Sequence, residues 1–247
     1  MSGHSKWSTI KRKKGAKDAA RGKLFGKLIR EITVAARQGG GDPSGNTRLR
    51  LAVQTAKDHN MPHDNIARAI KKGVGGGEGT HYEEVIYEGY GPGGVALMID
   101  TLTDNKNRTA GEVRHALTKH NGNLGENGCV AWIFEKRGII WVGRDKSDEE
   151  TLLEIAIDAG AEDVNDQGDG FEITCGPADF EAVRGAISGS GIEIQSASIG
   201  RLPSNVVSLE GEDARKIIRL MEALEELEDV QAVSANFDVP SEILQEG

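Results

Sequence analysis

The sequence contains very little cysteine. Only Cys129 and Cys175 occur in 247 residues, far apart and without CxxC spacing. This argues against a disulfide framework and a zinc knuckle, and it is typical of a reducing compartment. The histidines add no metal-binding pattern, because Pro62 interrupts the one pair at helical spacing, His59 and His63. We therefore expect no metal and no other cofactor.

Long apolar runs and aromatic side chains are also scarce. No run of about 18 apolar residues occurs, and the start lacks the apolar segment of a signal peptide, so we expect a cytoplasmic protein without a membrane partner. Aromatic residues make up 4% and hydrophobic residues 37% of a chain with 33 glycines, which favours several small aliphatic cores. The sequence has no GxSxG or HExxH motif and no activated Cys–His pair. Enzymatic activity, and with it a small-molecule substrate, is therefore the minority interpretation.

Positive charge is concentrated in the first third of the chain. Residues 1–37 carry eleven Lys and Arg against two Asp and Glu, in a chain whose net charge is −9. Residues 1–75 sum to +12 and residues 76–247 to −21. Because salt screens charge over about 8 Å, a partner responds to the local patch. The first third therefore predicts a polyanionic partner, and the acidic remainder should face away from phosphate or contact a protein.

The basic region is predicted to be an arm followed by three helices. Residues 1–16 have no hydrophobic period and should order on binding. Apolar residues recur at three- and four-residue spacing over 17–38, 46–58 and 63–72, which predicts a small helical bundle. The second and third helices could also be a helix-turn-helix, although many bundles contain such a pair and bind no DNA.

We expect the basic side chains of the arm and of the exposed helix faces to contact nucleic acid, with one tryptophan available for stacking on bases. A charged helix face is often merely solvated, but this one carries a single sign and continues the basic arm, which favours binding. The candidate contacts are Lys6, Trp7, Lys11, Arg12, Lys13, Lys14, Lys17, Lys23, Lys27, Arg30, Arg68, Lys71 and Lys72.

The rest of the chain alternates strand and helix patterns after a glycine-rich linker at 74–79. Residues 138–201 follow the order βαββαβ, which is ferredoxin-like. Strands expected at 83–88, 95–101, 130–135, 206–209 and 230–237, with helices at 107–120 and 212–227, complete a second α/β domain around it. The predicted fold class is therefore α+β, with a three-helix bundle followed by two ferredoxin-like α/β domains, the last inserted into the middle one. The predicted boundaries are 1–78, 79–137 plus 202–240, and 138–201.

The middle domain offers a second candidate contact patch. Three tyrosines lie within nine residues beside a Gly-Pro-Gly-Gly loop, and the polar stretch 103–109 opens a helix whose free N–H groups favour anions. A capped helix start with core tyrosines is an equally good interpretation. The inserted domain, at −10, lacks the basic aromatic strand of an RNA-recognition motif. The patch residues are Tyr87, Tyr90, Asn105, Lys106, Arg108 and Arg114.

Several motifs along the chain resemble the YebC/PmpR family, which includes the mitochondrial translational activator of cytochrome c oxidase subunit I. They are GHSKW and IKRKK near the start, AARQGG, NMPxDNIxRAIKKG, YEGYGPGGVA and TDNKNRT. The resemblance covers nearly the whole chain and implies a non-enzymatic regulator of three domains. By the same resemblance, the basic run 11–14 carries over as nucleic-acid contacts, and the tyrosine and TDNKNRT patches carry over less securely. Thr47, Cys129 and Ser234-Ala235 depart from the family pattern.

Two functions follow as hypotheses. The first is a DNA-binding transcriptional regulator that uses the helical bundle. The second is a ribosome-associated translation factor that binds ribosomal RNA, relieves stalled translation and contacts protein through the acidic domains. Both predict electrostatic binding, so charge does not distinguish DNA from RNA.

Overall fold

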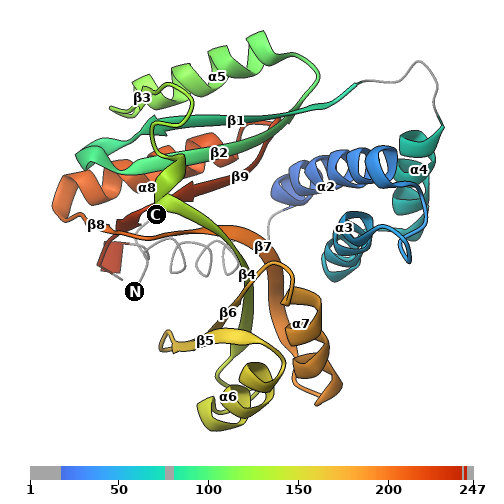
Figure 1. The fold of residues 1–247 in the computed structure, drawn as a ribbon. Helices are drawn as coiled ribbons and strands as arrows, with labels where there is room; N and C mark the ends of the chain where they lie inside the picture. Colours follow the sequence, from blue (N-terminus) through green and yellow to red (C-terminus); the bar gives the residue numbers. More distant parts are fainter. Residues whose placement is uncertain (1–17, 76–80, 241, 244–247) are drawn as a thin grey trace.

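The computed structural model describes residues 18–75, 81–240 and 242–243, with only the backbone for 18–21. Helices α2 (Asp18–Gly39), α3 (Thr47–Asp58) and α4 (His63–Val74) form a bundle beside two four-stranded sheets (Figure 1). The candidate arm contacts, from Lys6 to Lys17, lie outside the described residues. Among the described residues, no helix is long and apolar enough to span a membrane.

The bundle is held by an aliphatic core and by two close backbone approaches. Ile32 and Leu49 are fully buried at its centre. Asn46 accepts a hydrogen bond from the N–H of Leu49 and donates to two carbonyls at the end of α2, so one side chain joins α2 to α3. At Gly73, a Cβ atom would lie 2.5 Å from the carbonyl oxygen of Thr33, so only glycine lets α4 pack this closely on α2.

Sheet A has the strand order β3-β1-β2-β9 and is antiparallel throughout. Its strands are β1 (Glu83–Tyr90), β2 (Ala96–Thr103), β3 (Asn123–Leu124) and β9 (Val230–Ala235). Helices α5 (Lys106–Lys119) and α8 (Gly211–Glu225) pack on one face and bury the largest core of the molecule. The 3-10 helix η1 (Pro92–Gly94) joins β1 to β2, and β8 (Val207–Ser208) pairs in parallel with β10 (Phe237–Asp238).

Sheet B has the order β5-β6-β4-β7, with two helices on one face. Its elements are β4 (Phe134–Gly143), α6 (Glu149–Asp158), β5 (Ala161–Asp166), β6 (Gly170–Cys175), α7 (Phe180–Gly189) and β7 (Ile194–Pro203). This is the predicted βαββαβ order, and the predicted fold class is confirmed. The sheet A domain differs from this βαββαβ order, because it begins with a hairpin of β1 and β2. The exact domain boundaries stay a prediction.

Two strand predictions were wrong in detail. The expected strand at 130–135 and the first strand of the ferredoxin-like segment are instead the 3-10 helix η2 (Ala131–Ile133) and one long strand, β4. Lys136 and Arg137 interrupt the apolar pattern in the sequence. They nevertheless lie in β4, in a two-stranded ribbon with β7 that begins where Phe134 pairs with Pro203, and charged side chains reach solvent there. The expected strand 230–237 is interrupted at Asn236, whose side-chain oxygen accepts the N–H of Ala96 at 2.7 Å.

Candidate nucleic-acid interface

The open basic surface of the bundle lies along α4. A shallow groove between α2 and α4, with a volume of about 200 Å³, is lined by Ile29, Asn65, Arg68, Ala69 and Lys72. We call it the α2/α4 groove. Its floor is apolar, while the cations on its rim are exposed. Such a rim suits phosphate, and such a floor suits the flat face of a base or a sugar.

Tyr82 connects this groove to the neighbouring face of α2. The guanidinium carbon of Arg30 lies 5.6 Å from the centre of the Tyr82 ring, and Nζ of Lys72 lies 5.7 Å from it. Both distances are within the range of a cation–π interaction. One cation of α2 and one cation of α4 therefore lie against the same aromatic ring.

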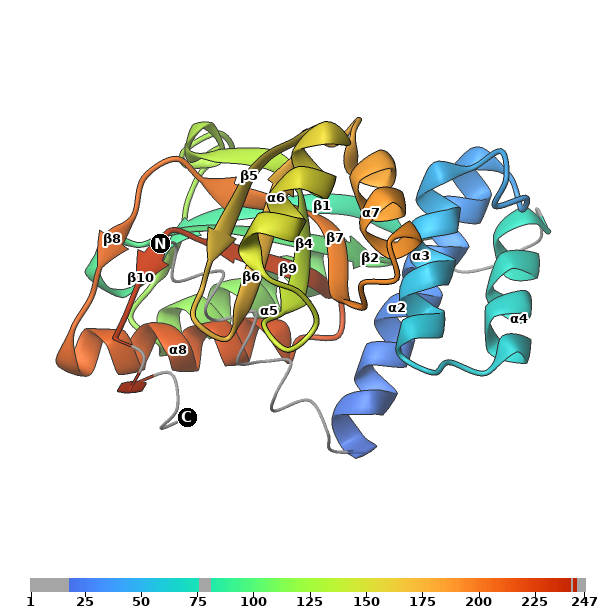
Figure 2. The ribbon, with the colours of Figure 1, turned by 90° about the horizontal axis from the view of Figure 1, so that it is seen from below.

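The three predicted contacts on α2 are engaged by the chain itself, although the Lys23 side chain is still 53% exposed. Lys23 pairs with Glu226, and Nζ of Lys27 donates to the carbonyl oxygen of Glu225 at 2.6 Å. The acceptors belong to residues 225–229, a segment we call the acidic turn, which joins α8 to β9. Figure 2 shows the C-terminal end of α8 pointing towards α2.

Arg30 makes the deepest of these contacts. It pairs with Glu228 and approaches Oδ1 of Asp229 at 3.3 Å, and its side chain is 11% exposed. Within the described residues of the bundle, the predicted contacts thus fall into two groups. Lys23, Lys27 and Arg30 are engaged by the chain itself, and those on α4 face outward.

The second predicted patch is divided by the geometry of β1. Tyr87 and Tyr90 are three residues apart in a strand, so they lie on opposite faces of sheet A. Tyr87 packs against the α5–α8 core and donates to the carbonyl oxygen of Lys106 at 3.1 Å. Tyr90 packs on the other face and donates to that of Cys129 at 3.2 Å. Burial raises the pKa of both phenols.

The start of α5 is satisfied by side chains of the protein itself. Asn105 caps the helix by accepting the N–H of Arg108 at 3.1 Å, and Lys106 pairs with Glu83. Arg108 pairs with Asp104 at 2.7 Å and also with Asp229. Arg114, further along the helix, is exposed, as Asn105, Lys106 and Arg108 are. Whether any of these residues contacts nucleic acid stays a prediction.

Asp229 is the centre of this region, and the sequence reasoning missed it. Its side chain is only 2% exposed, and Oδ2 accepts hydrogen bonds from Thr109 at 2.7 Å and Thr103 at 3.1 Å as well as from Arg108. Burial by itself would raise the pKa of Asp229, but these donors together hold the pKa below its usual value. The signal available in the sequence was an acidic segment at 225–229 together with a basic face on α2. Opposite charges attract, so the two could have been expected to meet.

A second buried carboxylate anchors the loop before β4. Glu88 accepts the N–H groups of Gly128, Val130 and Ala131 at 2.6, 2.8 and 2.9 Å. Burial opposes the charge, yet these three donors keep the pKa of Glu88 below its usual value. The loop leads into Trp132, which is 72% exposed. Sequence reasoning did not single out either residue.

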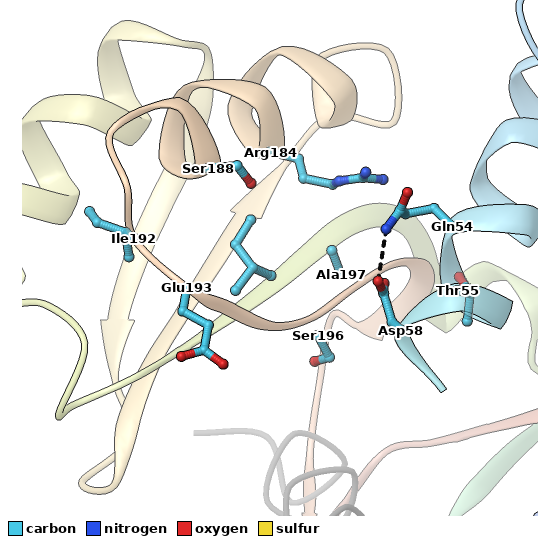
Figure 3. Close-up of a pocket in the computed structure, with 10 residues that line it drawn as sticks. Gln54, Thr55, Asp58, Arg184, Ser188, Ile192, Glu193, Ser196 and Ala197 are labelled. Carbon is cyan, nitrogen blue, oxygen red and sulfur yellow. Dashed lines mark hydrogen bonds between the residues drawn. The ribbon is translucent and has the colours of Figure 1, made fainter. Parts of the chain in front are cut away.

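A polar cleft of about 250 Å³ separates the bundle from sheet B (Figure 3). Gln54, which donates to Asp58 at 2.8 Å, lines the α3 side, and Arg184 lines the α7 side. Beside the cleft, Leu51 packs against the core under sheet B. The cleft therefore lies at the boundary between the helical bundle and the domain of sheet B. Across the described residues, no group of three or more His, Cys, Asp and Glu could hold a metal.

Comparisons with known proteins match the whole arrangement. A family model described as the TACO1/YebC protein N-terminal domain matches residues 5–76, and another, described as the TACO1/YebC second and third domain, matches residues 82–237. A probable transcriptional regulatory protein of Desulforapulum autotrophicum is 57% identical over 243 residues, 98% of each chain. One of Geobacter sulfurreducens is 56% identical over 245 residues, 99% of each. The crystal structure of a conserved hypothetical protein from Aquifex aeolicus is 53% identical, with a TM-score of 0.84, over 90% of this chain and 92% of that one.

Proposed function

The chain belongs to the TACO1/YebC family, as its motifs indicated, and we propose that it is a non-enzymatic transcriptional regulator that binds DNA through its helical bundle. A regulatory role is what the names of its relatives give at the level of the family. The observation that supports DNA binding by this chain is the α2/α4 groove, with an apolar floor and a basic rim.

The α4 cations are suited to phosphate because the described part of the chain offers them no carboxylate partner. Arg68 donates to the carbonyl oxygen of Asp64 at 3.2 Å and to the side chain of Asn65, so its guanidinium is held at the rim. Lys71 and Lys72 are exposed one turn further along. If each of the three neutralises one phosphate, they contribute about −2.7 to the slope of log K against log salt. That slope weakens binding about 40-fold between roughly 50 and 200 mM salt.

The bundle test compares two double charge reversals of equal size. Lys71→Glu with Lys72→Glu removes two of the rim cations. Lys119→Glu with Arg219→Glu reverses two exposed cations on α5 and α8, away from the bundle. Fluorescence anisotropy with a labelled DNA duplex should show that the first variant loses about two units of salt slope. The second variant should bind like wild type. Equal losses in both variants would refute binding through α4.

A specificity test separates the two functions predicted from the sequence. A DNA-binding regulator should prefer a selected genomic duplex over a scrambled one by about 10³ or more. The competing outcome is preferential binding of structured RNA, together with nuclease-sensitive co-sedimentation with ribosomes. That outcome would replace the transcriptional proposal with the translational one.

A further inference from the structure

Three cations on one face of α2 (Lys23, Lys27 and Arg30) lie against one short segment of the chain, the acidic turn. We propose that the acidic turn is an intramolecular competitor of nucleic acid, which must leave α2 before this face can bind phosphate. The inference rests on the proposed function and adds a regulation to the same surface.

The competing surfaces are contiguous. Arg30 contacts the acidic turn on one side and the Tyr82 ring on the other, and Lys72 of the α2/α4 groove contacts the same ring. A polyanion that follows the groove past Tyr82 therefore reaches the carboxylates of Glu226 and Glu228, which occupy the places its phosphates would take. Like charges repel, so the nucleic acid and the turn exclude each other there.

The turn carries more negative potential than its side chains alone provide. It begins at the last residue of α8, where the final carbonyl groups form the negative end of the helix dipole. Lys27 donates to one of these carbonyls, that of Glu225, at 2.6 Å. The basic face thus meets both carboxylates and a helix C-terminus, the combination of charge and directed acceptors that a phosphate backbone also offers.

The outer contact of the turn can open at small cost, and the contact with Arg30 holds more firmly. Glu226 and Glu228 are 64% and 82% exposed, and an exposed pair such as Lys23–Glu226 shifts an equilibrium by about fivefold at most, whereas the Arg30 side chain is only 11% exposed. Asp229 is different, because three donors other than α2 hold it. Residues 225–228 of the turn can therefore release α2 while Asp229 keeps its place at the start of α5.

The affinity test neutralises the turn without changing its shape. Glu226→Gln with Glu228→Gln removes both exposed charges, and Glu149→Gln with Glu150→Gln makes the same charge change in the exposed first turn of α6. Labelled duplex DNA and a matching single-stranded RNA serve as probes at low salt. The turn variant should bind the preferred probe about fivefold more tightly than wild type, and the α6 variant should change affinity less than about twofold.

A second measurement follows the turn directly in the unmodified protein. Hydrogen exchange of peptides covering residues 222–230 should become faster when nucleic acid binds, while peptides of α4 become slower. A turn that stays equally protected or gains protection, together with unchanged affinity of the turn variant, would overturn the competition and leave nucleic-acid binding intact. If neither probe binds the wild-type protein in a salt-dependent way, the proposed function fails, and the competition fails with it.

Discussion

Replacing the buried carboxylate Asp229 by asparagine should destabilise the fold more than any change at an exposed acid. The asparagine side chain would keep the shape but lose the charge. If its oxygen takes the place of Oδ2, which accepts from both threonine hydroxyls, its NH2 group faces Arg30, and in the flipped orientation both hydroxyls lose their acceptor. Hydrogen bonds to a charged group contribute about 1.5–3 kcal/mol each. The partly exposed Arg108 pair adds about 1 kcal/mol or less, and Thr109 recovers part of its loss through the carbonyl of Asn105 at 3.1 Å.

Together these contributions give about 3 kcal/mol for Asp229→Asn, a drop in Tm of roughly 6–12 °C for a chain of this size. The assay is thermal and urea unfolding at neutral pH. Asp104→Asn is the matched control, because it removes the exposed acid that also pairs with Arg108 and should cost less than about 1 kcal/mol. Equal stabilities for Asp229→Asn and wild type, or equal costs for the two variants, would refute the reasoning.

The pH dependence provides an independent check on the same carboxylate. The folded pKa of Asp229 is lower than its unfolded value of about 3.9, so its contribution is present above that value and is lost as the pH falls through the folded pKa. The stability difference between wild type and Asp229→Asn should therefore be constant near neutral pH and should narrow below about pH 4. If the stability difference between the two proteins is unchanged in acid, the effect of Asp229→Asn comes from packing and not from the charge.

Three further predictions concern other parts of the chain. Glu88→Gln should cost about 1–3 kcal/mol in urea unfolding, because its charge holds three N–H groups of the loop before Trp132; unchanged loop exchange would contradict this. Gly73→Ala should destabilise the bundle by about 1–3 kcal/mol, whereas Gly111→Ala, with open space around it, should be neutral or stabilising by up to about 1 kcal/mol. Lys13→Glu with Lys14→Glu should weaken nucleic-acid binding with an unaltered circular dichroism spectrum, and undiminished affinity would remove the basic arm from the interface.

The helices of the bundle could be predicted closely because their ends are marked in the sequence. Gly39 ends α2 and two more glycines follow it, Asn46 caps α3, and Pro62 precedes α4. The ferredoxin-like order of sheet B could be predicted for a similar reason, since turn residues separate its elements. Strand β4 could not, because its first four residues lie in a two-stranded ribbon with β7, where the buried face of a larger sheet does not impose an alternating pattern.

The candidate site was harder to predict because its contacts are distant in sequence. Nothing local shows that Arg30 meets Glu228 or that Asp229 meets Thr109. The sequence shows that the basic face of α2 carries charge of one sign. It does not show which segment contacts that face, because this depends on the tertiary arrangement. The division of Tyr87 from Tyr90 could have been predicted, because residues three apart in a strand point to opposite faces.

The position of β9 beside β2 has a consequence for synthesis of the chain. Leu97 pairs with Ala235, so sheet A stays incomplete until residue 235 has left the ribosome, whereas sheet B is continuous between Phe134 and Pro203 and can close earlier. Until then, β2 presents an unpaired edge able to pair with another chain. A premature stop before Val230 would therefore leave the bundle and sheet B able to form, attached to an open and aggregation-prone strand.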